Sequence, residues 1–137
     1  MVAARRDRFE QAGLFDPTVK VFEDTEFYLR LSRVCRFAAV GEPLIYKRNR
    51  ASSITGQRGN LMGHHAFVAF KAAAQDKRLL PLVPKRLSQR ARKLGNVYYY
   101  AGDLAAARQM YALAARLDPL SGLAWGALLL ATVGAGP

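Results

Sequence analysis

The sequence predicts a mostly helical chain, in which a small α/β segment precedes an all-α helical hairpin. Apolar residues recur with a helical period after Asp24, and two short strand candidates follow at 37–40 and 44–47. The last third of the 137 residues carries small and aromatic side chains in a repeat-like pattern. We expect an α/β segment, a basic helical linker and a helical tail, which cover residues 1–57, 58–86 and 87–137.

The first predicted element is a short helix from Arg5 to Ala12, which ends because Gly13 follows it. A loop over Leu14–Lys20 comes next, since the residue before Pro17 is pushed out of the helical region. This loop leads directly into an acidic cluster.

The central predicted helix begins in this acidic cluster, at Glu23 and Asp24. One face is apolar and consists of Phe27, Tyr28, Leu31, Val34 and Cys35. The opposite face is expected to meet solvent and consists of Glu26, Arg30 and Arg33.

Asp24 is a candidate general base because of its place at the helix start. Free backbone N–H groups and the helix dipole stabilise a negative charge there. A carboxylate that is held ionised can accept a proton from a hydroxyl group. The alternative is that Glu23 and Asp24 are ordinary capping and first-turn acids.

Two short strands are predicted after this helix, at Phe37–Val40 and Leu44–Lys47, around a turn at Gly41-Glu42-Pro43. Two strands and two helices cannot close a sheet, so we expect an open edge. We therefore interpret Met1 as a truncation or as a start assigned too late.

An ordered set of motifs over residues 4–56 resembles the C-terminal part of the catalytic domain of family 2 glycosyltransferases. The motifs are Arg5–Asp16, Glu23-Asp24, Leu29–Arg33, Arg36–Val40 and Glu42–Arg48. The resemblance implies a GT-A fold and inverting transfer of a sugar from a nucleotide sugar to an acceptor hydroxyl. It also implies that Asp24 is the base, that Glu23 assists beside it, and that the acceptor is a glycan or a lipid-linked molecule.

The same resemblance implies a divalent metal, Mg²⁺ or Mn²⁺, held mainly by an Asp-x-Asp motif. No Asp-x-Asp occurs in this chain, so we expect weak binding of nucleotide sugars and no activity without an N-terminal half. Many relatives have His where this chain has Asn49, which is a poorer transition-metal ligand. Arg48 and Arg50 are candidate contacts to a diphosphate, and the alternative is a solvated loop.

Positive charge is concentrated between Arg58 and Lys93, where nine residues are basic and one is acidic, in a chain of net charge +11. Pro84 is expected to open a helix there. The basic residues on its outer side are Lys85, Arg86, Arg90 and Lys93. They form either a solvated face or a patch for an anionic membrane surface. Nucleic acid is the less favoured partner, because no zinc motif or aromatic-interleaved basic strand accompanies the charge.

The tail resembles a tetratricopeptide repeat in the spacing of its small and aromatic residues. The matching residues are Leu94, Gly95, Tyr98, Gly102, Ala107, Tyr111, Ala114 and Pro119, with Trp125 in the next repeat. Small side chains should let two helices approach closely, while Leu104, Tyr111 and Leu117 fill the seam. Asp103 is expected to cap the second helix. The resemblance implies a protein partner bound by the tail.

Cys35 is the single cysteine, which excludes an intramolecular disulfide, and we expect a buried thiol. The N-terminus has no apolar run after its charges and is not a secretory signal. We predict a cytoplasmic protein that can contact the inner face of the membrane. The leading alternative to an enzyme is a non-catalytic helical interaction module, followed by a basic binder of membranes or nucleic acid.

Overall fold

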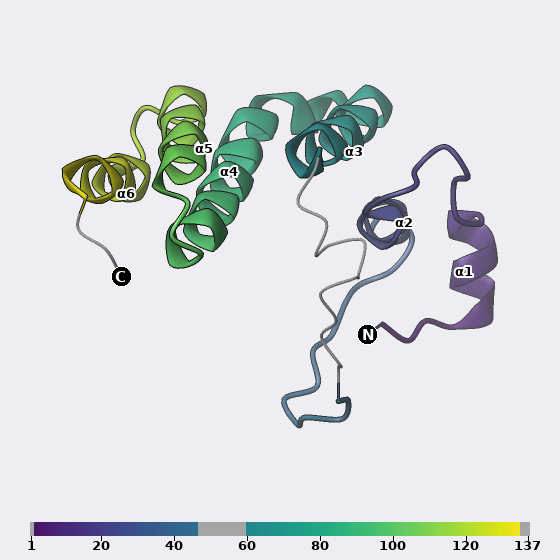
Figure 1. Ribbon diagram of the computed structural model, residues 1–137. Helices are drawn as coiled ribbons and strands as arrows, with labels where there is room; N and C mark the ends of the chain where they lie inside the picture. The colour runs from purple at the N-terminus through teal and green to yellow at the C-terminus, as the bar shows by residue number, and fades with distance from the viewer. Residues whose placement is uncertain (1, 47–59, 135–137) are drawn as a thin grey trace. The chain divides into compact units, whose positions relative to one another are not determined.

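The computed structural model describes residues 2–46 and 60–134, and this part of the chain is all α (Figure 1). The chain forms two compact units, Met1–His64 and His65–Pro137, and their boundary falls inside α3. The helices are α1 (Arg6–Ala12), α2 (Glu23–Leu31), α3 (Leu61–Gln75), the 3₁₀ helix η1 (Lys77–Leu82), α4 (Val83–Tyr100), α5 (Leu104–Leu117) and α6 (Gly122–Val133).

The predicted α/β class is wrong, because the described residues contain no strand and therefore no GT-A fragment. Both strand candidates have irregular backbone at 37–40 and 44–46, and no backbone hydrogen bond joins them to other described residues. A strand is stable only when a neighbour pairs its N–H and C=O groups and its apolar side chains are covered. Here Phe37, Val40 and Leu44 stay exposed. Lys47 lies outside the described residues.

Three phenylalanine rings form the packing centre between α1 and α2. The ring of Phe27 lies 4.6 Å from that of Phe9 and 4.8 Å from that of Phe15, measured between centroids. Phe9 comes from α1 and Phe15 from the loop after Gly13, which ends the helix with a φ of +81° as the sequence predicts. The loop and both helices are therefore tied to one buried ring.

An ion pair on α2 corrects the predicted orientation of that helix. Glu26 is buried and accepts hydrogen bonds from the guanidinium of Arg30, although both were expected to face solvent. Arg30 also donates to the carbonyl oxygens of Ala12 and Leu14. We call this set of contacts the Glu26–Arg30 clamp. It satisfies carbonyls at the end of α1, so the charged pair is turned inward.

The end of α2 also differs from the prediction. The helix stops at Leu31, while Val34 and Cys35 follow in the turn. Phe27 and Leu31 are buried as expected. Cys35 is only half-buried, and its thiol donates to the carbonyl oxygen of Leu31 over 3.3 Å.

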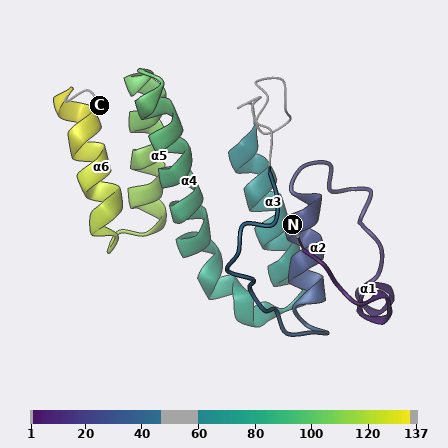
Figure 2. The same cartoon turned by 90° about the horizontal axis from the view of Figure 1, so that it is seen from below.

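The second unit contains the predicted helical hairpin, with α4, α5 and α6 side by side (Figures 1 and 2). Gly95 of α4 faces the buried ring of Tyr111 on α5, where a Cβ atom would lie 2.5 Å from a ring carbon. Ala107 and Ala114 of α5 are fully buried. The close approach of two helices at small residues is therefore confirmed.

Polar groups fix the register of α4 on α5. The buried hydroxyl of Ser88 donates to the carbonyl oxygen of Ala114 over 2.8 Å. The phenol of Tyr111 donates to Oδ1 of Asn96 over 2.9 Å. Each bond joins the two helices at a different height, so a shift of one helix along the other would break both.

Asp103 caps α5 as predicted, since its Oδ1 accepts from the backbone N–H of Ala106 over 3.0 Å. We expect Asp103→Ala to lower the free energy of unfolding of the second unit by about 1 kcal/mol, because the cap bond is lost. Urea unfolding followed through Trp125 fluorescence measures this change. Asp103→Asn is the control, because its amide oxygen can still accept the bond, and an equal loss in both variants would contradict the cap.

The basic segment contains α3 and the start of α4, which are separated by η1. α3 ends at Gln75, because the side chain of Asp76 accepts from the N–H of Arg78 and starts η1. Pro84 lies in the first turn of α4. In the described part of the chain, no helix has the length and apolar character needed to cross a membrane.

Candidate functional site

The acid pair Glu23 and Asp24 lies in the first turn of α2, and both side chains are exposed. Asp24 Oδ1 accepts hydrogen bonds from the backbone N–H of Thr25 over 2.6 Å and from its hydroxyl over 3.3 Å. The N-cap residue of α2 is Phe22, whose side chain forms no cap bond. The carboxylate of Asp24 therefore lies inside the helical turn and does not occupy the capping position.

The backbone immediately before the acid pair is strained. Phe22 has a φ of +64°, the left-handed conformation that residues with a side chain rarely adopt. Such a conformation costs about 1–2 kcal/mol and persists only where surrounding contacts hold it. The sharp turn at Phe22 directs the chain from the loop into α2, so Glu23 and Asp24 begin the helix with their side chains in solvent.

The Glu26–Arg30 clamp and the three phenylalanine rings hold α2 against α1 and the loop. Phe27 and Arg30 belong to α2, and they contact Phe9, Phe15 and the end of α1. The guanidinium of Arg30 also lies over the Phe27 ring, 5.4 Å from its centroid. The acid pair thus begins the helix that packs against α1 and the loop.

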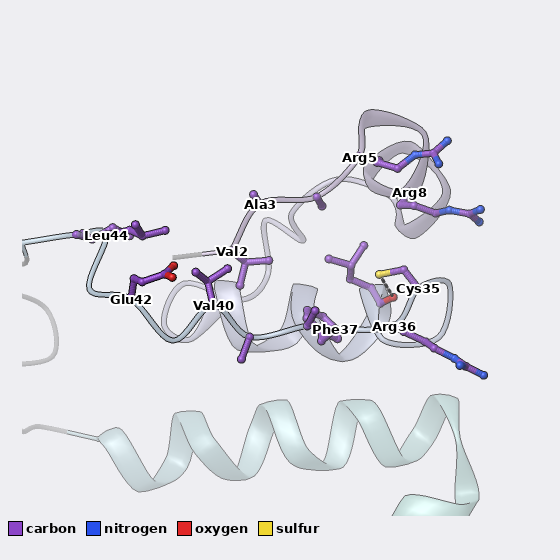
Figure 3. A pocket seen from close by; sticks show the side chains of 15 residues that line it. Val2, Ala3, Arg5, Arg8, Cys35, Arg36, Phe37, Val40, Glu42 and Leu44 are labelled. Atoms are coloured by element: carbon purple, nitrogen blue, oxygen red, sulfur yellow. Dashed lines mark hydrogen bonds between the residues drawn. The ribbon is translucent and has the colours of Figure 1, made fainter.

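A groove in the first unit is separate from the acid pair (Figure 3). It has a volume of 960 Å³ and lies between the N-terminal residues 2–5 and the irregular segment 35–45. Val2 and Val40 lie close to one another at the groove, and the side chains of Arg5, Arg8 and Arg36 point outward beyond one end of it (Figure 3). Sequence reasoning missed this groove, because it is built from segments that were assigned to a helix start and to strands.

Other candidate residues are placed only in part. Arg48, Asn49 and Arg50 lie outside the described residues. Residues 2–46 and 60–134 contain no group of three or more His, Cys, Asp or Glu side chains arranged to hold a metal ion.

The basic face of α4 is mostly as predicted. Lys85, Arg86 and Lys93 are exposed, but Arg90 is half-buried. The Nε atom of Arg90 is buried without a hydrogen-bond partner among the described residues. Desolvation and, second, the positive charge of Arg86 lower the pKa of the Arg90 guanidinium. The helical period alone does not predict the partial burial of Arg90, because it assigns basic side chains to the solvent-facing side.

Comparisons with known proteins found no protein-family model, no curated protein and no solved structure that matches this chain. The assignment of the site therefore depends on the residues and their geometry.

Proposed function

We propose that this chain takes part in the inverting transfer of a sugar from a nucleotide-sugar donor to an acceptor hydroxyl, with Asp24 as the general base. One observation supports this best: the exposed acid pair begins a helix whose position is fixed by a buried ion pair and three aromatic rings. A base must be held within hydrogen-bond reach of the proton that it removes. The contacts that hold α2 against α1 and the loop would keep Asp24 in place in this way.

The roles of the two acids follow from their surroundings. Asp24 has one oxygen engaged by Thr25, which orients the carboxylate and leaves its second oxygen for the acceptor hydroxyl. Glu23 precedes Asp24 at the helix start and orients the acceptor. The acceptor is a glycan or a lipid-linked hydroxyl.

The donor side of the reaction needs groups beyond this pair. A divalent ion, Mg²⁺ or Mn²⁺, would neutralise the departing diphosphate, and Arg48 and Arg50 would donate to it. No Asp-x-Asp occurs in the sequence to hold that ion. The proposal accordingly assigns to this chain the acceptor side of the reaction.

We expect Asp24→Asn to lower kcat about 10²–10⁴-fold in the longest protein that the reading frame encodes, because an amide cannot accept the proton. The amide oxygen of Asn can still accept from Thr25, so the local fold should be kept. Release of nucleoside diphosphate from nucleotide sugars, with Mg²⁺ or Mn²⁺ present, measures turnover.

Asp7→Asn is the matched control, because Asp7 is an exposed acid in the first turn of α1. It should leave turnover unchanged. If Asp24→Asn retains full turnover, Asp24 is not the base. If no nucleotide sugar is consumed by the unsubstituted protein, the second candidate becomes the better one.

That second candidate is a non-catalytic helical interaction module, and α6 favours it. The inner side of α6 packs through Ala124 and Ala131, which are fully buried. Its other side leaves large apolar residues exposed, namely Leu123, Trp125, Leu129, Leu130 and Val133. An open apolar face at the last helix is typical of stacked helical repeats, in which each helix pair is covered by the next.

A further inference from the structure

The cationic stripe of α4 consists of Arg86, Arg90 and Lys93. These residues are four and three positions apart, so they lie on consecutive turns along one face of the helix. Three positive charges that follow one another in this way repel each other and raise the local positive potential. The stripe is therefore more than a scattered set of surface lysines and arginines.

The three charges form no ion pair in the described part of the chain. Asp7, Glu10, Glu26 and Asp76 form ion pairs with other basic residues and not with the cationic stripe. Arg86 and Lys93 are exposed. Their ammonium and guanidinium groups are consequently available to an external anion.

Arg90 shows that the stripe is built into the fold. Its Nε atom is buried without a partner among residues 2–46 and 60–134, which leaves an N–H donor desolvated and unpaired. The half-buried stem restricts the guanidinium, so less freedom is lost when an anion binds it. Desolvation of the guanidinium and the charge of Arg86 both act against the cation, and a bound anion would offset both.

We propose that the cationic stripe binds a phosphate group. Two guanidinium groups can donate to phosphate oxygens in the bidentate manner that their planar geometry favours, and Lys93 adds a point charge. Three residues on consecutive turns span about 10 Å along the helix, which suits one phosphate or diphosphate group. A nucleic acid presents a long row of phosphates and would need a longer basic track than these three residues provide. This inference does not depend on the proposed function.

The test compares two variants of the full chain that lose the same charge. Arg86→Gln/Lys93→Gln removes two residues of the stripe, and Lys77→Gln/Arg116→Gln removes two exposed basic residues elsewhere in the second unit. Inorganic pyrophosphate is titrated by calorimetry, and phosphatidylcholine vesicles with phosphatidic acid are tested by co-sedimentation. Pure phosphatidylcholine vesicles and duplex DNA are the reference probes.

We expect the stripe variant to bind the phosphate probes about tenfold more weakly than the unsubstituted chain, because two charge-assisted contacts are lost. The charge-matched variant should change by less than about twofold. Binding of both probes assigns the stripe to the phosphate group itself. Binding only of vesicles assigns it to a lipid headgroup, and binding only of pyrophosphate to a soluble phosphate.

Three outcomes would overturn the proposal. Equal losses in the two double variants would mean that only net charge matters. Absence of binding to both phosphate probes would remove the site, and binding confined to DNA would assign the charge to nucleic acid. Far-ultraviolet circular dichroism checks that both variants are folded, which is expected because all four substituted side chains are exposed.

Discussion

Replacing Arg30 with methionine is expected to destabilise the first unit by about 3–5 kcal/mol, because it leaves a buried carboxylate without its counter-charge. The side chain of Glu26 is 5% exposed and that of Arg30 is 17% exposed. The substitution also leaves the carbonyls of Ala12 and Leu14 without their donor. Amide hydrogen exchange across α1 and α2 measures the loss of protection.

A second ion pair on the neighbouring helix provides a matched control. Arg6 and Glu10 have the same spacing as Glu26 and Arg30 and the same 2.9 Å distance from Nε to Oε1, but they are 93% and 65% exposed. We expect Arg6→Met to change protection little, since water screens the pair and solvates the remaining acid. Equal effects of Arg6→Met and Arg30→Met would show that burial does not decide the strength of the clamp.

Replacing both members of the buried pair separates the charge from the contacts. In Glu26→Leu/Arg30→Met no buried charge remains, so most of the lost stability should return. The stability that is not recovered would measure the cost of leaving the carbonyls of Ala12 and Leu14 without a hydrogen-bond donor.

Tyr111→Ala is expected to lower the free energy of unfolding of the second unit by about 3–5 kcal/mol, because it removes a buried aromatic ring that packs between α4 and α5. Tyr111 is 3% exposed, and its ring fills the space that Gly95 leaves open. Its hydroxyl also bonds to Asn96. Urea unfolding, followed through the fluorescence of Trp125, measures the change.

Tyr111→Phe divides this effect into packing and hydrogen bonding. The ring stays in contact with Gly95, and only the bond to Asn96 is lost, so we expect a cost of about 1 kcal/mol. A cost for Tyr111→Phe as large as that for Tyr111→Ala would assign the stability of the hairpin to the hydrogen bond. Gly95→Ala should also destabilise, because its Cβ atom would overlap a ring that is held in place.

The helical hairpin could be predicted because its determinants are local in the sequence. Gly95 and Tyr111 face one another, and Asp103 starts α5, at the spacings from which the hairpin was expected. Whether the two strand candidates form strands could not be predicted in this way, because the stability of a strand depends on a partner that is distant in the sequence. Segments 37–40 and 44–46 have strand-like composition and remain unpaired within the described residues.

The candidate site was predicted in its location but not in its support. Periodicity places Glu23 and Asp24 at the start of α2, where the structure has them. The same periodicity predicts that Glu26 and Arg30 face solvent, because it treats every charged side chain as exposed. Periodicity contains no information about the carbonyl of Ala12, which accepts a hydrogen bond from Arg30 only once the loop has folded.

The contact between Gly95 and Tyr111 also bears on how the second unit folds. Glycine is a poor helix former, so α4 on its own would be weakest in the turn that contains Gly95. That turn is stabilised when the ring of Tyr111 packs against it. Because residues 101–103 alone separate α4 from α5, the two helices meet with little loss of chain entropy. We expect them to form together in one fast cooperative step, with α4 depending on α5 for its continuity.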